Sequence, residues 1–148
     1  GADVVFGAEP KRPVRSTGGH LGCDANLKGF AFEYMTGGRV VVLGDPGMWI
    51  CSGMTGGVVY LRFWPEMGLD ETALRHRLAR GAKVKLEPIG KQGLADIREL
   101  LGVYLAILSA HGQPEEAARL RPLREDPCLH FRQVVPQVQA EDGAVSTE

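Results

Sequence analysis

The chain has 148 residues, which is enough for one domain that buries its own core. Its formal net charge of −1 gives no electrostatic reason to expect nucleic acid or an anionic membrane as a partner. No transmembrane or signal-peptide pattern occurs in the sequence. The cysteines, Cys23, Cys51 and Cys128, are odd in number and too widely spaced for a disulfide framework. We therefore expect a reducing compartment and a cytoplasmic protein.

A glycine-rich motif recurs in the first half of the chain, with its threonines 19 residues apart. Each copy reads Thr-Gly-Gly, and the three copies are Thr17, Gly18 and Gly19; Thr36, Gly37 and Gly38; and Thr55, Gly56 and Gly57. Glycine enters the φ > 0 region without a Cβ penalty, so each copy can bend the chain sharply. We interpret these residues as structural turns.

Short β-branched runs follow the last two copies, and a weaker run at 4–6 resembles the remains of an earlier unit. One such unit cannot bury its own apolar face, but stacked units can, with strands about 4.8 Å apart. The pattern predicts a mainly β protein: a single-stranded parallel β-helix of about three coils, with a leucine-rich repeat or a hairpin meander as alternatives. Its interior is expected to include Phe30, Phe32, Trp49, Ile50 and Cys51.

After Tyr60 the period changes, which predicts an α-helical C-terminal appendage. Asp70 is expected to cap a helix over 71–80 that stops at Gly81. The basic residues of this helix are expected to form a solvated face, and they are Arg75, His76, Arg77 and Arg80.

Alternation around Val84 and Leu86 predicts a strand that Pro88 ends. Further helices are expected over 94–109, where an apolar stripe would cap the end of the stack, and over 114–123. Residues 128–135 are expected to form a last strand or an extended strap. The predicted division is 1–64 for the coils, 65–136 for the helical and extended cap, and 137–148 for a disordered tail.

The stretch from Phe32 to Gly44, Phe-Glu-Tyr-Met-Thr-Gly-Gly and then Val-Val-Val-Leu-Gly, leads into Gly-Met-Thr-Gly-Gly at 53–57 with Tyr60 after it. This block resembles the C-terminal, GXGXG-motif domain of the glutamate synthase large subunit. The likeness is strong over 32–61 and looser over the rest of 14–136. It implies a right-handed β-helix, although about three coils are fewer than that family's domain has.

The resemblance also implies a role. In that family this domain carries no chemistry and packs between a glutamine-hydrolysing amidotransferase domain and an FMN-containing synthase domain. FMN and an iron–sulfur cluster are therefore expected only on partner chains, with no cofactor in this one. The family's amidotransferase has a cysteine nucleophile at its mature N-terminus, where this sequence has Gly1. A related domain occurs in a subunit of formylmethanofuran dehydrogenase.

The residues by themselves point to no catalytic or metal site. The cysteines lack the clustering of an iron–sulfur site, and the histidines form no zinc motif. Gly44-Asp45-Pro46-Gly47 lacks the lysine of a phosphate loop and is interpreted as a turn. Glu33, beside Tyr34, is the best candidate for a functional polar residue, against the alternative of a turn hydrogen bond or an ion pair with a neighbouring coil.

The sequence thus predicts a non-catalytic structural subunit or domain of a glutamate synthase-type system, in L-glutamate biosynthesis. Its expected partners are amidotransferase and FMN-binding synthase polypeptides, with no nucleic acid and no membrane. Two alternatives stay open: a self-assembling β-helix scaffold that forms a homo-oligomer, because an open strand edge can pair with a second copy, and a scaffold like that of formylmethanofuran dehydrogenase. An enzyme in its own right is disfavoured, because no nucleophile–base pair is evident.

Overall fold

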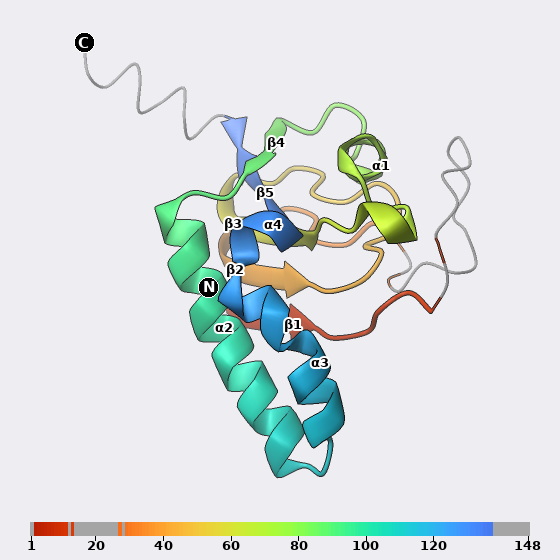
Figure 1. Cartoon of the computed structure of the whole chain (residues 1–148). Helices are drawn as coiled ribbons and strands as arrows, with labels where there is room; N and C mark the ends of the chain where they lie inside the picture. The colour runs from red at the N-terminus through yellow and green to blue at the C-terminus, as the bar shows by residue number, and fades with distance from the viewer. Residues whose placement is uncertain (1, 12, 14–26, 28, 138–148) are drawn as a thin grey trace.

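The computed structural model describes residues 2–11, 13, 27 and 29–137. A sheet of order β1-β2-β3-β5-β4 runs through the fold (Figure 1). The elements, in chain order, are β1 (Asp3–Phe6), β2 (Thr36–Val42), β3 (Gly56–Arg62), the 3₁₀ turn η1 (Pro65–Met67), α1 (Glu71–Arg77), β4 (Val84–Pro88), α2 (Lys91–Ala110), α3 (Pro114–Glu125), α4 (Pro127–His130) and β5 (Phe131–Pro136).

The predicted parallel β-helix is wrong. The strands β1, β2 and β3 do pair in parallel, with Val40 opposite Val59, but the sheet then continues as an open, mixed sheet. After β3 the chain leaves the repeating path through α1, β4, α2 and α3. It returns as β5, which pairs antiparallel with β3 through Tyr60 and Gln133. A β-helix needs each new coil to run parallel to the last, and β5 takes that place in the opposite direction.

Strands β4 and β5 come from the second half of the chain, yet they are hydrogen-bonded into the sheet that the repeat strands begin. The predicted appendage therefore supplies part of the sheet as well as helices. The proposed boundary at residue 64 stays a prediction.

Both faces of the sheet are covered. Val40, Val42, Val59 and Leu61 point into one core, which is closed by the segments that precede β3 and by α1. Val41, Leu43 and Tyr60 point into a second core, which α2 and α3 close from the opposite face. A central strand buried on both faces needs a continuous apolar run rather than strict alternation. This explains the apolar runs Val-Val-Val of β2 and Val-Val-Tyr-Leu of β3.

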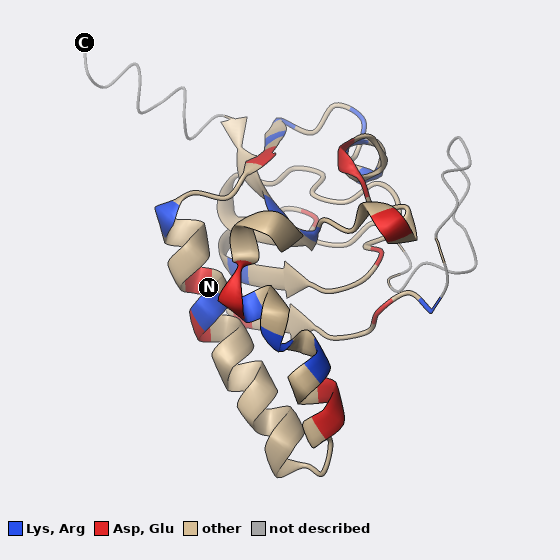
Figure 2. Ribbon diagram, viewed as in Figure 1, with Lys and Arg blue, Asp and Glu red and all other residues tan. Residues whose placement is uncertain are grey.

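The long helix α2 lies on a face of the sheet, so the expectation that its stripe caps the end of a stack is wrong. Ile97, Leu101 and Leu105 pack against that face, and α3 runs beside α2 as the second arm of a hairpin (Figure 1). The second half of α2, from Leu100 to Ala110, contains no charged residue (Figure 2). Among the described residues, no helix has both the length and the apolarity needed to cross a bilayer.

The structure confirms that Asp70 caps α1, since its carboxylate accepts from the Ala73 N–H at 2.9 Å. The helix ends at Arg77 rather than at residue 80. Leu78 is extended there, and the Ala79 N–H donates to the Ile50 carbonyl at 2.8 Å. Pairing with the segment before β3 therefore competes with the last helical turn and replaces it. The last predicted strand begins later than expected, because residues 127–130 form α4.

Candidate interaction surface

Two turn segments, 29–35 and 47–53, lie one above the other, and their backbones join them. Phe30 N–H donates to the Met48 carbonyl at 2.8 Å, and Tyr34 N–H donates to the Ser52 carbonyl at 2.7 Å. Between these, the Cys51 N–H donates to the Ala31 carbonyl at 3.0 Å. The segment 47–53 also pairs with the end of α1, because the Ile50 N–H donates to the Arg77 carbonyl at 2.9 Å.

Both segments place ordinary residues in the left-handed region of backbone space. Phe30, Phe32 and Tyr34 have φ of 56°, 62° and 54°, and Trp49 and Cys51 have φ of 60° and 66°. Such angles are uncommon outside glycine, and bulky residues adopt them at a cost of order 1–3 kcal/mol each. They persist where surrounding contacts impose them. Here the backbone hydrogen bonds between the stacked segments provide that restraint.

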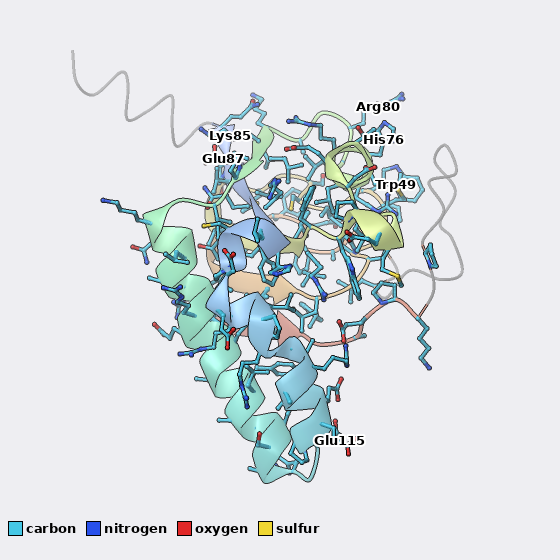
Figure 3. All side chains as sticks on the ribbon, viewed as in Figure 1. Trp49, His76, Arg80, Lys85, Glu87 and Glu115 are labelled. Atoms are coloured by element: carbon cyan, nitrogen blue, oxygen red, sulfur yellow. The ribbon has the colours of Figure 1, made fainter. Side chains whose placement is uncertain are left out.

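Three aromatic side chains of these segments lie at or near the surface. We call Phe30, Tyr34 and Trp49 the aromatic turn surface. The rings of Phe30 and Trp49 stack with centroids 4.9 Å apart, and Phe30 is 57% exposed and Tyr34 73% exposed. Trp49 lies on the side of the molecule that also carries His76 and Arg80 (Figure 3). Exposed aromatic groups gathered in one place are typical of protein interaction sites.

The predicted interior residues differ in their burial. Ile50 and Cys51 are fully buried, as expected, and burial raises the pKa of the Cys51 thiol to about 12. Phe32 is half-buried and packs edge-on to Phe6. Phe30 is instead exposed, and Trp49 is half-buried like Phe32. Of the five, Phe30 is therefore the one whose predicted interior position is wrong.

Glycines allow the stacked backbones to approach each other. A Cβ on Gly57, which has φ of 80°, would lie 2.8 Å from the Gly37 carbonyl carbon. A Cβ on Gly53 would lie 2.5 Å from the Tyr34 ring, so Gly53 lets that ring lie on the backbone. Thr55 N–H and Gly56 N–H both donate to the Met35 carbonyl, at 2.9 and 3.2 Å. The second and third Thr-Gly-Gly copies are thus in direct contact, with Thr36 opposite Gly56.

The first copy, Thr17, Gly18 and Gly19, lies outside the described residues, as does Cys23. Glu33 is exposed and makes no hydrogen bond or ion pair with any residue that the structure describes. Its functional role stays a prediction. Within the described ranges, His, Cys, Asp and Glu side chains form no cluster suited to a metal ion.

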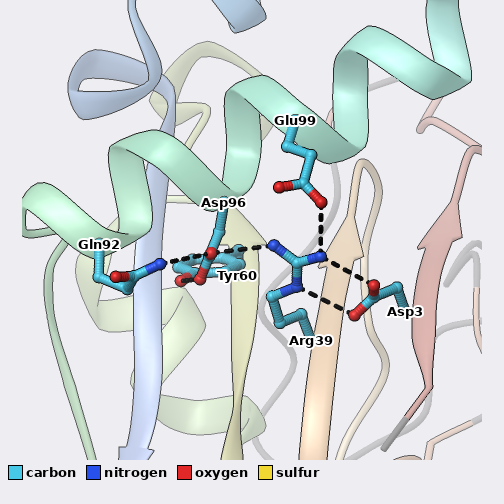
Figure 4. Close-up of polar contacts among 6 residues, drawn as sticks. All are labelled: Asp3, Arg39, Tyr60, Gln92, Asp96 and Glu99. Atoms are coloured by element: carbon cyan, nitrogen blue, oxygen red, sulfur yellow. Dashed lines mark hydrogen bonds and ion pairs between the residues drawn. The ribbon is translucent and has the colours of Figure 1, made fainter.

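A network of charged side chains fastens the repeat strands to α2 (Figure 4). Arg39, which follows the second Thr-Gly-Gly copy, donates from Nε and Nη2 to the two carboxylate oxygens of Asp3 at 2.9 and 2.8 Å. It also donates to Asp96 at 3.0 Å and to Glu99 at 2.9 Å, both on α2. Tyr60 O–H donates to the second Asp96 oxygen at 2.6 Å. The network therefore joins β1, β2, β3 and α2.

These contacts hold the network in its charged form. Burial of the Asp96 carboxylate opposes ionisation, but hydrogen bonds from Tyr60, Gln92 and Arg39 outweigh it and lower the pKa of Asp96. The hydrogen bond from Arg39 lowers the pKa of Asp3. Hydrogen bonds to Asp3, Glu99 and Asp96 raise the pKa of Arg39. Burial, with the Asp96 hydrogen bond, raises the pKa of Tyr60, so its hydroxyl stays a donor.

A second pair, Asp45 and Arg77, lies in the other core. Arg77 donates from Nε and Nη2 to the two Asp45 oxygens, both at 3.0 Å, and the side chains are 7% and 5% exposed. Asp45 also accepts from Gly47 N–H at 2.9 Å, so the Gly44–Gly47 segment is a turn closed by its own aspartate. Arg77 was predicted to belong to a solvated basic face. That prediction is wrong, because the helix ends with Arg77 turned toward the turn segment.

The comparisons with known proteins agree with the motif. Residues 9–136 match the family described as "GXGXG motif". The chain belongs to the GXGXG-motif family. This GXGXG domain is 34% identical over 107 residues to the glutamate synthase [NADPH] large chain of Bacillus subtilis. The aligned residues make up 71% of this chain and 6% of that relative. It is 70% identical over 30 residues to the ferredoxin-dependent glutamate synthase of Cyanidium caldarium, and those residues make up 20% of this chain and 2% of that relative. The chain thus spans a small part of these relatives.

The contact between Gly37 and Gly57, at the starts of β2 and β3, predicts unequal effects for two similar substitutions. Gly57→Ala combines a left-handed φ with a clash against backbone, so we expect a loss of about 2 kcal/mol or more in the free energy of unfolding. Gly37→Ala meets no atom within 4 Å and has no left-handed φ, so it should change stability by less than about 0.5 kcal/mol. Urea denaturation measures both. Equal effects would contradict the stacking of the two copies.

The network predicts a pH dependence of stability. The folded-state pKa of Asp96 is below its unfolded value of about 3.9, so its contribution is complete above that pH and disappears as pH falls through the folded-state value. Asp96→Asn should cost about 1–3 kcal/mol at pH 7, and the deficit should shrink below pH 4. Glu115→Gln, on an exposed residue, is the control. A deficit that is the same at pH 7 and pH 3 would contradict an ionic role for Asp96.

Proposed function

We propose that this GXGXG domain is a non-catalytic structural part of a glutamate synthase-type system, in which it positions an amidotransferase polypeptide and an FMN-binding synthase polypeptide. Membership of the family and the likeness to two glutamate synthases support an involvement in L-glutamate synthesis. The positioning role and the identity of the two partners are part of the proposal.

The observation that carries the proposal is the contrast between the internal polar groups and the exposed rings. The two largest ionic contacts described above are internal to the domain: Arg39 holds three carboxylates, and Arg77 holds Asp45. The aromatic turn surface is exposed instead, on backbone that stacked hydrogen bonds make rigid. A rigid exposed aromatic patch can bind a partner with little loss of side-chain entropy. We assign the aromatic turn surface to contact with the synthase polypeptides.

The chemistry would then belong to the partners. FMN and an iron–sulfur cluster are proposed on the partner chains, and the GXGXG domain is proposed to hold neither. A cytoplasmic location stays a prediction.

Two features favour a second function, self-assembly as a scaffold. Strand β1 lies at the edge of the sheet and pairs on one side within the described residues, which leaves an edge that another strand can join. The uncharged half of α2 exposes Val103 by 58% and Ile107 by 50%. Light scattering at several concentrations separates the two functions. A stable homo-oligomer that binds neither the amidotransferase polypeptide nor the FMN-binding synthase polypeptide would favour the scaffold. A scaffold like that of formylmethanofuran dehydrogenase remains a further alternative.

The decisive experiment is co-expression with amidotransferase and FMN-synthase polypeptides, followed by co-purification and an assay of glutamine-dependent glutamate formation. Phe30→Asn with Tyr34→Asn removes two rings while keeping residues that tolerate left-handed φ. We expect this double variant to fold and to bind the partners at least about 10-fold more weakly, a loss of about 1.4 kcal/mol.

The matched control is Val103→Gln with Ile107→Gln, which removes two exposed apolar side chains from α2. Thermal unfolding of both double variants shows whether each is folded. The proposal fails if neither partner co-purifies with the unmodified domain. The assignment of the surface fails if the α2 variant loses binding and the Phe30/Tyr34 variant keeps it.

A further inference from the structure

A cleft of about 390 Å³ opens between the end of β3, η1, α3 and α4. Its charged and polar lining includes Arg62, Arg119 and His130, and its apolar lining includes Trp64, Leu123 and Leu129. A volume of this size lies at the lower end of the range for pockets that hold small molecules. The cleft takes no part in the aromatic turn surface or in the Arg39 network, so its role is independent of the proposed function.

Arg62 is the unusual residue of the cleft. It is 6% exposed, and its guanidinium group lies 3.9 Å from the centre of the Trp64 ring. Its Nη1 donates to Glu9 at 2.9 Å and to the Leu43 carbonyl at 3.2 Å. Its buried Nε has no hydrogen-bond partner among the described residues. A buried charged donor without a partner is costly, and native structures seldom keep one without a reason.

Two other arginines of this fold show what the missing partner would be. Arg39 and Arg77 each use the Nε and Nη2 edge of the guanidinium group to hold both oxygens of an aspartate, Asp3 and Asp45 respectively. For Arg62, no described residue occupies that edge. This edge presents two parallel N–H groups whose spacing matches a carboxylate. The chemistry of the site therefore favours a carboxylate ligand.

Arg62 has one carboxylate partner, and it shares that partner with a second arginine. Glu9 accepts from Arg62 and also from Arg119 at 2.8 Å, so one carboxylate is shared between two guanidinium groups. Arg119 has a second carboxylate in Glu116 at 3.4 Å, whereas Arg62 has Glu9 alone among the described residues. Burial and the charge of Arg62 lower the pKa of His130, which keeps it neutral at pH 7. Glu66 lies at the exposed rim.

We propose that this cleft binds a small organic carboxylate, with its oxygens on the free edge of Arg62 and a compact apolar body against Leu123 and Leu129. Leu129 is 64% exposed, so an apolar ligand body would cover a side chain that otherwise faces solvent. An anion without an apolar body would use the guanidinium group alone and bind more weakly.

The test is a titration of the ¹⁵N-labelled chain with benzoate, followed by the amide signals and the arginine Nε–H signals. Benzoate should shift the Arg62 Nε–H and the His130 amide in a saturable way. Benzamide has the same shape without the charge, and acetate has the charge without the ring. We expect both to bind at least about 10-fold more weakly than benzoate. Shifts that are scattered over the surface, or equal for benzoate and benzamide, would overturn the proposal.

Two variants keep the test independent of folding. Arg62→Lys retains a cation beside Glu9 but lacks the paired N–H groups, and it should weaken benzoate binding at least about 10-fold. Because Arg62 is buried, a second comparison uses the exposed Leu129: Leu129→Glu should weaken binding, and Leu129→Lys should keep or strengthen it. The proposal is wrong if folded Arg62→Lys binds benzoate as well as the unmodified chain, or if the two Leu129 variants behave alike.

The carboxylate could come from a free acid or from an acidic side chain of another polypeptide, and the chemistry is the same in both. Repeating the benzoate titration after binding of the synthase polypeptides separates these sources. Retained benzoate shifts assign the site to a free acid. Loss of the shifts, together with competition by benzoate for the partner, assigns it to a partner side chain.

Discussion

The fold depends on one constraint, which is that the starts of β2 and β3, with the turn segments before them, come close enough for their backbones to touch. At Gly57, any side chain would meet the Gly37 backbone, and the Met35 carbonyl accepts two N–H groups from the next copy of the motif. This contact sets the parallel register of β2 against β3. It also fixes the stacked segments before those strands, where bulky residues adopt left-handed φ.

Two ionic clusters hold the stacked part to the rest of the chain, one on each face of the sheet. Arg39 fastens the repeat strands to α2, and the Asp45–Arg77 pair fastens the turn segment to α1. In each cluster an arginine uses its paired N–H edge on an aspartate, which fixes orientation as well as distance. Removing one member of the buried Asp45–Arg77 pair leaves an uncompensated charge, so this pair maintains the geometry of the turn segment.

Much of the local structure could be predicted from the sequence, because glycine doublets, capping residues and apolar stripes act over a few residues. Examples are the strands with the valine runs after Gly38 and Gly57, the cap at Asp70 and the helix along Ile97 and Leu101. The global topology was not predictable in this way. Antiparallel pairing of β5 with β3 joins residues that are far apart in the chain, and no local period records it.

The functional surface was only partly predictable for the same reason. Phe30 was predicted to lie in the interior, but its ring is 57% exposed and stacks on Trp49 outside the core. Arg77 looked like a surface charge because its burial depends on Asp45, 32 residues away. A charge inside an apolar stripe is a signal that could have found part of the network, since Asp96 precedes the buried Ile97 on α2. The unpartnered, buried Nε of Arg62 has no sequence signature.

The central claim, that the two Thr-Gly-Gly copies lie directly over one another in a sheet that β5 then extends in the opposite direction, can be tested by nuclear Overhauser effects in solution. The account predicts parallel cross-strand contacts that place Val40 beside Val59, together with antiparallel contacts that place Tyr60 beside Gln133. A spectrum in which Val40 and Val59 are not neighbours, or in which the strand after β3 pairs in parallel, would contradict it.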